Sequence, residues 1–279
     1  MDIPDPKSGV LSGLLDYLTS KLEVRDVSLT EELPASVSQM LAWEETNGCS
    51  LPSDLKEFYR TNNGLTLTWK YLYNDLNADV VHDIGRLNVN SIQELHLLGG
   101  QTQTDIFFSQ EGSLISARQP SLNDLDTPLS SDRWSPSLSG RCKTFILDYC
   151  PSCGHVCLVY NLENDADCRY WLLDLSLCWH PLSTTFSDYL RLAVVHLALV
   201  QWPYALTILG LSPQWERWFR MFIPKRLEID LELSALQTNS TSIAHTTLDT
   251  SKIVIVKPSK EKKSKVEIRP TQGVQGHNN

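Results

Sequence analysis

Residues 51–69, LPSDLKEFYRTNNGLTLTW, predict a helix, a stop and a strand within one short stretch. Pro52 and Ser53 start the helix, and three apolar residues form its buried face: Leu55, Phe58 and Tyr59. Asn62-Asn63-Gly64 stops it, because glycine accepts the left-handed conformation that a helix C-terminus often needs. Three apolar residues then alternate with polar ones, as in a half-buried strand: Leu65, Leu67 and Trp69.

Apolar residues three and four positions apart predict five further helical segments along the chain. They cover 8–24, 36–48, 91–99, 186–199 and a last helix that begins at Ser212-Pro213. The residues on their helical steps are Leu11, Leu14, Leu15, Leu18 and Leu22; Val37, Met40, Leu41 and Glu44; and Phe186, Leu190, Val194 and Leu197. Ser91 with Glu94 resembles a capping box, and Thr185 with Asp188 caps the fourth segment. Pro203 interrupts the apolar pattern that follows and Gly210 ends it.

Further strands are predicted at 80–89, 143–149, 155–161 and 169–176. The last three are separated by hairpin-sized turns, which favours antiparallel pairing over helical crossovers. The fold class is therefore α+β, an antiparallel-rich sheet flanked by N- and C-terminal helices. Domain limits of 8–225 are expected, with a long loop at 113–141.

Composition places the chain among folded, non-secreted proteins. Of its 279 residues 42% are hydrophobic, and a net charge of −9 gives no overall bias toward nucleic acid. The N-terminus MDIPDPKSG lacks the basic and apolar segments of a signal peptide. The longest apolar runs, such as 192–200, have about half of the roughly 20 residues that a membrane span requires. We expect a soluble intracellular protein with seven reduced cysteines.

The strongest metal signal is CPSCGHVC, residues 150–157, which contains Cys150, Cys153, His155 and Cys157. Cys-x-x-Cys is the spacing of half a zinc site, but no second ligand pair is present. A redox role would need one thiol at a helix N-terminus, whereas this pair joins two predicted strands. We expect a hairpin turn with free thiols, and leave a zinc site as the alternative.

Catalytic motifs are missing from the chain. It contains no G-x-S-x-G, no G-x-x-x-x-G-K-[ST] and no G-x-G-x-x-G. The seven histidines are scattered, and His180 and His196 are expected to be packed or hydrogen-bonded. The acidic pairs Glu31-Glu32 and Glu44-Glu45 are expected on solvated faces. We therefore expect no enzyme activity and no cofactor.

Two further features are candidates for binding. The aromatic stripe of the last helix is predicted to be core, although exposed aromatics can anchor partners: Trp215, Trp218, Phe219 and Phe222. From 234 onward the sequence turns polar, and 234–279 is expected to be a disordered lysine-rich tail. Residues 252–269 carry a local charge of +5 against −14 for the rest of the chain. Candidate contacts to an acidic partner such as a tubulin tail are Lys257, Lys260, Lys262, Lys263 and Lys265.

Trp43-Glu44, Leu51-Pro52 and Asn63-Gly64 together resemble the SUKH superfamily, the fold of the yeast cell-wall regulators. The segments at 156–160, 170–205 and 210–219 resemble one branch of it, a family of tubulin polyglutamylase subunits. The resemblance extends in order over residues 8–225. It implies a helix–strand corner at residues 43–64 in an α+β domain, and it brings no catalytic, cofactor or metal residues.

The resemblance also implies a function. In that family the subunit is not the ligase; a tubulin-tyrosine-ligase-like partner uses ATP to add glutamates to tubulin tails. The expected role is a scaffold or targeting subunit in the cytoplasm, at microtubules, centrosomes, centriolar satellites or the base of cilia. Two alternatives remain open at this point, a SUKH binding module with a different partner and a small zinc enzyme at Cys150, Cys153 and Cys157.

Overall fold

The stretch 51–69 folds as its pattern predicts in the computed structural model, which describes residues 6–75, 78–98, 142–161 and 168–240. Helix α3 (Ser53–Thr61) buries one face, and strand β2 (Leu65–Asp75) begins after a short turn. The helix ends at Asn62, which is extended, so the prediction that glycine caps it is wrong. Gly64, with φ of 111°, is needed because a Cβ there would lie 2.9 Å from the carbonyl oxygen of Val89.

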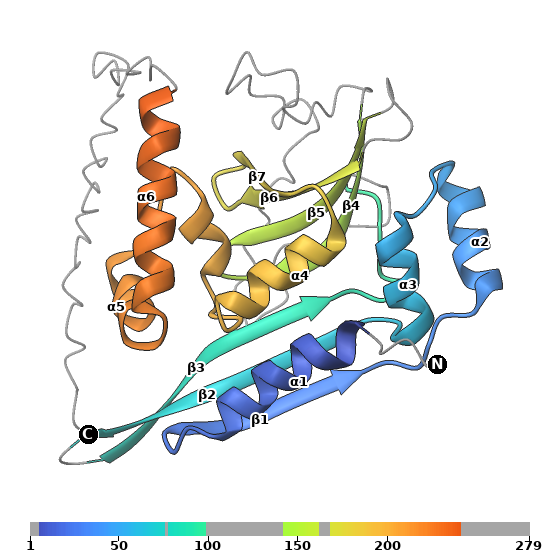
Figure 1. Ribbon diagram of the computed structural model, residues 1–279. Helices are drawn as coiled ribbons and strands as arrows, with labels where there is room; N and C mark the ends of the chain where they lie inside the picture. Colours follow the sequence, from blue (N-terminus) through green and yellow to red (C-terminus); the bar gives the residue numbers. More distant parts are fainter. Residues whose placement is uncertain (1–5, 76–77, 99–141, 162–167, 241–279) are drawn as a thin grey trace, which may run out of the picture. The chain divides into compact units, whose positions relative to one another are not determined.

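Two antiparallel sheets form the centre of the described structure (Figure 1). The first has the order β1-β2-β3 and joins β2 to β1 (Val24–Glu31) and β3 (Ala78–Val89). The second has the order β4-β5-β6-β7. Its strands are β4 (Cys142–Cys150), β5 (Gly154–Asn161), β6 (Cys168–Asp174) and β7 (Trp179–Ser183). The predicted α+β class and the antiparallel pairing of the three central strands are confirmed.

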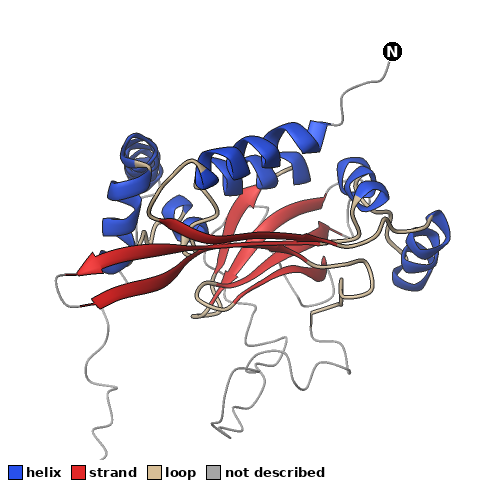
Figure 2. Cartoon of the chain, turned by 90° about the horizontal axis from the view of Figure 1, so that it is seen from below, coloured by secondary structure: helices blue, strands red, loops and turns tan. Residues whose placement is uncertain are grey.

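The remaining helices lie mostly on one side of the sheets (Figure 2). They are α1 (Pro6–Thr19), α2 (Val37–Asn47), α4 (Phe186–Val195), the 3-10 helix η2 (Trp202–Leu206), α5 (Pro213–Phe222) and α6 (Pro224–Ser240). The main core lies between these helices and the sheets. A smaller apolar cluster, which includes Ile146, Cys157 and Trp171, covers the other face of the second sheet. Strands β4 to β6 are therefore buried on both faces, which explains their nearly continuous apolar sequences.

The predicted helix at 91–99 is wrong. Residues 92–94 form a turn, and the chain then runs beside β4, where Leu98 N donates to Thr144 O at 2.8 Å and Ile146 N donates to His96 O at 3.0 Å. The backbone groups that a helix would use are thus engaged by a strand far along the chain. Local capping signals could not reveal this competing partner.

Other boundaries also differ from the predictions. Helix α1 ends at Thr19, Leu22 is exposed, and Val24 begins β1, a strand that was not predicted. Strand β7 and helix α6 were also missed. Because α6 buries Leu227 and Asp230, ordered packing continues beyond residue 225.

Helix α4 begins at its predicted Thr185 cap but ends at Val195, earlier than predicted. Leu197 and Ala198 adopt positive φ angles of 53°, which turns the chain back toward the first sheet. There Arg86 N donates to Ala198 O at 2.7 Å and Val200 N donates to Ile84 O at 3.0 Å. The end of this helix is set by pairing with β3.

Gly85 is required by the position of one tryptophan. It pairs across the ladder with Trp69, which is fully buried and whose Nε1 donates to Leu197 O at 2.9 Å. A Cβ at Gly85 would lie 1.7 Å from that same Nε1. The indole therefore occupies the space that any other residue would need.

We expect Gly85→Ala to lower the free energy of unfolding by about 3 kcal/mol, because Trp69 must move and lose its hydrogen bond. Urea unfolding measures this. Gly13→Ala in α1 is the matched control, since nothing lies within 4 Å of its added Cβ; it should raise stability by up to about 1 kcal/mol. Equal stability of the Gly85 variant and the wild type would contradict this account of the core.

Candidate functional site

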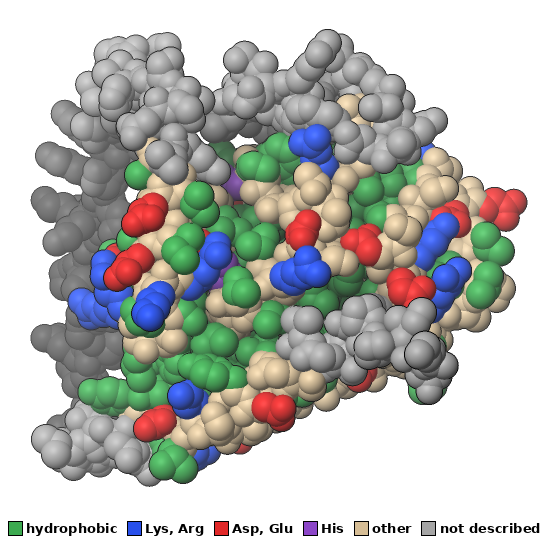
Figure 3. Space-filling view, viewed as in Figure 1, with side chains coloured by type: hydrophobic (Ala, Val, Ile, Leu, Met, Phe, Trp, Pro, Cys, Tyr) green, Lys and Arg blue, Asp and Glu red, His purple; other side chains and the backbone are tan. Residues whose placement is uncertain are grey.

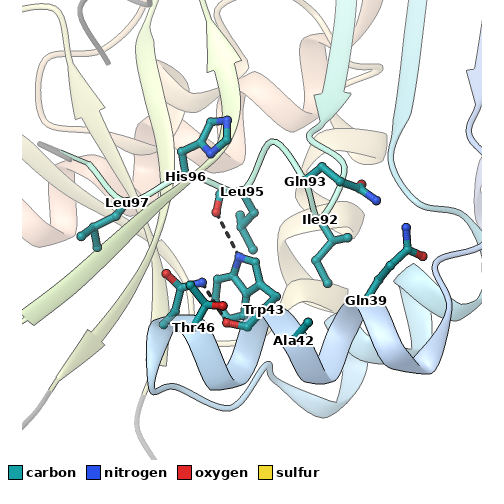
Figure 4. Close-up of a pocket in the computed structure, with 10 residues that line it drawn as sticks. Gln39, Ala42, Trp43, Thr46, Ile92, Gln93, Leu95, His96 and Leu97 are labelled. Atoms are coloured by element: carbon teal, nitrogen blue, oxygen red, sulfur yellow. Dashed lines mark hydrogen bonds between the residues drawn. The ribbon is translucent and has the colours of Figure 1, made fainter. Parts of the chain in front are cut away.

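An open groove lies between helix α2 and the extended segment that follows β3 (Figure 4). Its volume is about 400 Å³. The lining residues are Gln39, Ala42, Trp43, Thr46 and Asn47 on one side and Ile92, Gln93, Leu95, His96 and Leu97 on the other. Apolar side chains with a few amide groups are a lining that ligand-binding clefts share.

Local sequence fixes α2 in place. Ser36 Oγ accepts from Gln39 N at 3.2 Å, and Gln39 Oε1 accepts from Ser36 N at 2.8 Å, which completes a capping box. Ala35 and Met40, at the two positions of a hydrophobic staple, are both buried. Gly48 ends the helix in the left-handed conformation, as predicted from Asn47-Gly48.

Trp43 forms the floor of the groove and connects α2 to the opposite wall and to strand β4. Its Nε1 donates to Leu95 O at 3.1 Å, and its ring centroid lies 4.7 Å from that of Phe145 in β4. Glu44 beside it pairs with Lys56 at 2.7 Å and accepts from Leu51 N. The expectation that Glu44 lies on a solvated face is therefore wrong, because its ion pair connects α2 to α3.

Two carboxamides point toward one another at one end of the groove (Figure 4). Gln39 Oε1 accepts from Ser36, and Gln93 Oε1 accepts from Asn63 Nδ2 at 2.8 Å. Because each amide oxygen accepts a hydrogen bond from within the chain, each NH₂ group is left to act as a donor at this end of the groove. The pair can bind a carbonyl or carboxylate oxygen while an apolar side chain rests on Trp43.

Sequence reasoning singled out Trp43 as a motif residue but did not predict the groove. Gln93 and Leu97 fell in the segment predicted as a helix. The groove depends on that segment being extended.

The three cysteines of the candidate zinc motif lie on different faces of the second sheet. Cys150 and Cys153 belong to the main core, whereas Cys157 belongs to the smaller cluster. Cys153 Sγ donates to Val200 O at 3.4 Å. Within the described ranges, no three Cys, His, Asp or Glu side chains are grouped as metal ligands would be. Among the described residues none of the seven cysteines forms a disulfide, and burial raises the pKa of Cys157.

The histidines of interest are buried and packed, as predicted. His180 Nε2 lies 2.9 Å from Asp174 Oδ2, and Asp174 Oδ1 also closes the turn between β6 and β7. His196 Nε2 lies 2.8 Å from Asp230 Oδ2, which docks α6 on the end of α4. Burial lowers the pKa of His155 to about 4, so this imidazole is neutral.

The aromatic stripe of α5 is confirmed as core. Phe219 is fully buried, while Trp215, Trp218 and Phe222 pack against the core in part. The stripe joins α5 to the first sheet, since Phe222 meets Trp69 with centroids 5.3 Å apart. The lysines of the tail, including Lys257 to Lys265, and the loop predicted at 113–141 lie outside the described residues.

Asp148 is the buried carboxyl group at which β3, β4 and α4 meet. Arg86 Nη1 lies 3.6 Å from its Oδ1, and Tyr189 donates to its Oδ2 at 3.4 Å. Burial outweighs these partners and raises the pKa of Asp148 to about 6, from 3.8. Its surroundings are structural, so this shift affects folding.

Because the folded protein favours protonated Asp148, its contribution to stability is present below pH 4 and lost as the pH rises through 6. Between pH 4.5 and 7.5, the free energy of unfolding of the wild type should fall by about 2 kcal/mol relative to that of Asp148→Asn. Chemical unfolding of both proteins at each pH measures the difference. A difference that does not vary with pH would show that Asp148 is ionised throughout.

The fold defines an α+β domain with two antiparallel sheets, and the comparisons with known proteins assign it to a family. The chain belongs to the SMI1 / KNR4 family (SUKH-1), whose profile matches residues 34–192. That range contains α2, α3, the groove and both sheets except β1. The predicted SUKH resemblance is confirmed.

Relatives along nearly the whole chain carry a more specific name, tubulin polyglutamylase complex subunit 2. The protein of Rattus norvegicus is 33% identical, over 95% of this chain and 86% of the relative. The Mus musculus protein is 35% identical over the same shares, and the Homo sapiens protein is 36% identical over 95% of this chain and 84% of its own. The predicted resemblance to this subunit is therefore also confirmed.

No solved structure matches the chain. Among the described helices, none combines the length and the apolar character needed to cross a bilayer.

Proposed function

We propose that this protein is a non-catalytic scaffold or targeting subunit of a tubulin polyglutamylase complex. The observation that carries the proposal is the 33–36% identity, over 95% of the chain, to proteins named as subunit 2 of that complex. A tubulin-tyrosine-ligase-like partner would supply ATP chemistry and add the glutamates. The proposed sites of action are microtubules, centrosomes, centriolar satellites and the base of cilia.

Features of the chain support a binding role. Its sequence lacks phosphate-loop and nucleophile-elbow motifs. The buried Asp174, His180, His196 and Asp230 are engaged with each other in pairs that hold elements together. The groove beside α2 offers an apolar floor and two amide donors, which suit an extended segment of a partner chain.

Removal of this chain tests the proposal directly. Cells that lack it should yield a polyglutamylase assembly of altered composition, with tubulin glutamylation reduced at least several-fold. Mass spectrometry of tubulin tails and of the purified assembly provides both measurements. Normal composition and normal glutamylation would reject the role.

The groove should contribute to assembly. Ala42 is exposed and lines the groove, so Ala42→Arg would fill it without disturbing the core. We expect about 10-fold weaker association with the complex, equivalent to the loss of one well-placed contact. Gly13→Arg, which adds the same side chain to open space on α1, should bind as the wild type does. Equal binding by both variants would exclude the groove.

The lysine-rich tail is proposed to contact acidic tubulin tails through Lys257, Lys260, Lys262, Lys263 and Lys265. Truncation after residue 240 should weaken cosedimentation with microtubules and remove its dependence on salt. Charge-neutral Lys→Gln changes at the same five positions should act like the truncation. Salt-sensitive binding that survives truncation would assign the contact elsewhere.

A SUKH binding module with a different partner is the second candidate. It is supported by the family match over 34–192, which on its own specifies a domain class and no partner. Purification of the native protein distinguishes the two, because this candidate requires partners other than polyglutamylase subunits.

A further inference from the structure

Helix α2 exposes an aliphatic stripe on a face separate from the groove. Val37 and Leu41 are four residues apart on one side of the helix, and each is 58% exposed. Leu33, which precedes the helix, is 87% exposed. Figure 3 shows hydrophobic side chains gathered over α2 at the outer edge of the molecule. We call Leu33, Val37 and Leu41 the α2 stripe.

The stripe belongs to a rigid helix. Ser36 and Gln39 cap its start, Gly48 ends it, and Met40 and Trp43 bury its opposite side. A helix of 11 residues presents a straight ridge of about 16 Å. Because this ridge is already ordered, a partner would not lose binding energy in ordering it.

Carboxylates lie at both ends of the stripe. Glu32 adjoins Leu33, and Glu45 follows Leu41 by one helical step. Neither makes an ion pair with any described residue. The cations of α3 are already engaged, Lys56 with Glu44 at 2.7 Å and Arg60 with Glu57 at 3.3 Å. Lys143 Nζ, at the C-terminal end of α2, donates to Asn47 O at 2.6 Å. The stripe itself is therefore apolar, with a carboxylate at each end.

We propose that the α2 stripe docks an amphipathic helix of another subunit, with aliphatic residues at its centre and Lys or Arg toward its ends. This inference rests on the proposed function and adds the surface and the chemistry of the partner. Aliphatic side chains would cover Val37 and Leu41, while the basic residues would meet Glu32 and Glu45. A second copy of this chain fits poorly, since stripe-to-stripe contact in either direction brings carboxylates together.

The test uses the full-length chain and the other subunits of the complex. Val37→Ser with Leu41→Ser should weaken association about 30-fold, which corresponds to two truncated anchor residues. Ile229→Ser with Leu233→Ser is the matched control, because these α6 residues have the same i, i+4 spacing and are 47% and 48% exposed. The control should bind normally, and both variants should keep the wild-type unfolding transition.

Charge reversal provides a second readout. Glu32→Lys with Glu45→Lys should weaken association and flatten its dependence on salt. Normal binding by the stripe variant would overturn the inference, as would loss of binding by the α6 control alone.

Two other occupants would also overturn it. One would be shown by dimerisation of the isolated chain that the stripe variant abolishes. The other would be shown by a peptide of residues 252–265 that binds the wild type but not the variant. If the wild-type chain does not associate with polyglutamylase subunits, the proposed function itself is wrong. If the wild type associates and the stripe variant binds equally well, only the inference about the stripe is wrong.

Discussion

The contact between Trp69 and Gly85 is the constraint on which the arrangement of the two sheets depends. The indole lies over the glycine and donates to Leu197 O, so the segment after α4 must run along β3. That segment then offers Val200 O to the thiol of Cys153 in the turn between β4 and β5. One buried tryptophan thereby ties the first sheet, the end of α4 and the second sheet into one core.

Helix α2 is anchored by a second tryptophan, Trp43. Trp43 reaches from α2 to Phe145 of β4 and to the backbone of Leu95, so the helix is held by packing as well as by its caps. The groove side and the α2 stripe of this helix remain exposed. The groove presents amide donors beside an apolar floor, whereas the α2 stripe presents aliphatic residues between carboxylates. A single fixed helix can thus display two chemically different surfaces.

The sequence was most informative where local pattern and tertiary environment agreed. Helix α3, the start of α4 and the strands β4 to β6 follow from caps, turns and apolar spacing. Errors arose where a distant partner competed with local preference. The segment 91–98 has capping residues, but its backbone forms hydrogen bonds with β4. The residues after α4 leave the helix, and the backbone of Ala198 and Val200 pairs with β3. The groove was missed for the same reason, because its second wall is that extended segment.

The sequence by itself determined the α+β class, the helix–strand corner at residues 51–69 and the resemblance to SUKH proteins. These properties follow from the spacing of neighbouring residues, because the pattern of a helical face or of a strand is complete within ten residues. The tertiary structure alone decided that Cys150 and Cys153 lie across the sheet from Cys157, and that Glu44 staples two helices. It also decided which side of α2 is covered. Such facts depend on which elements pack against one another in the fold, and the periodicity of a single segment does not contain that information.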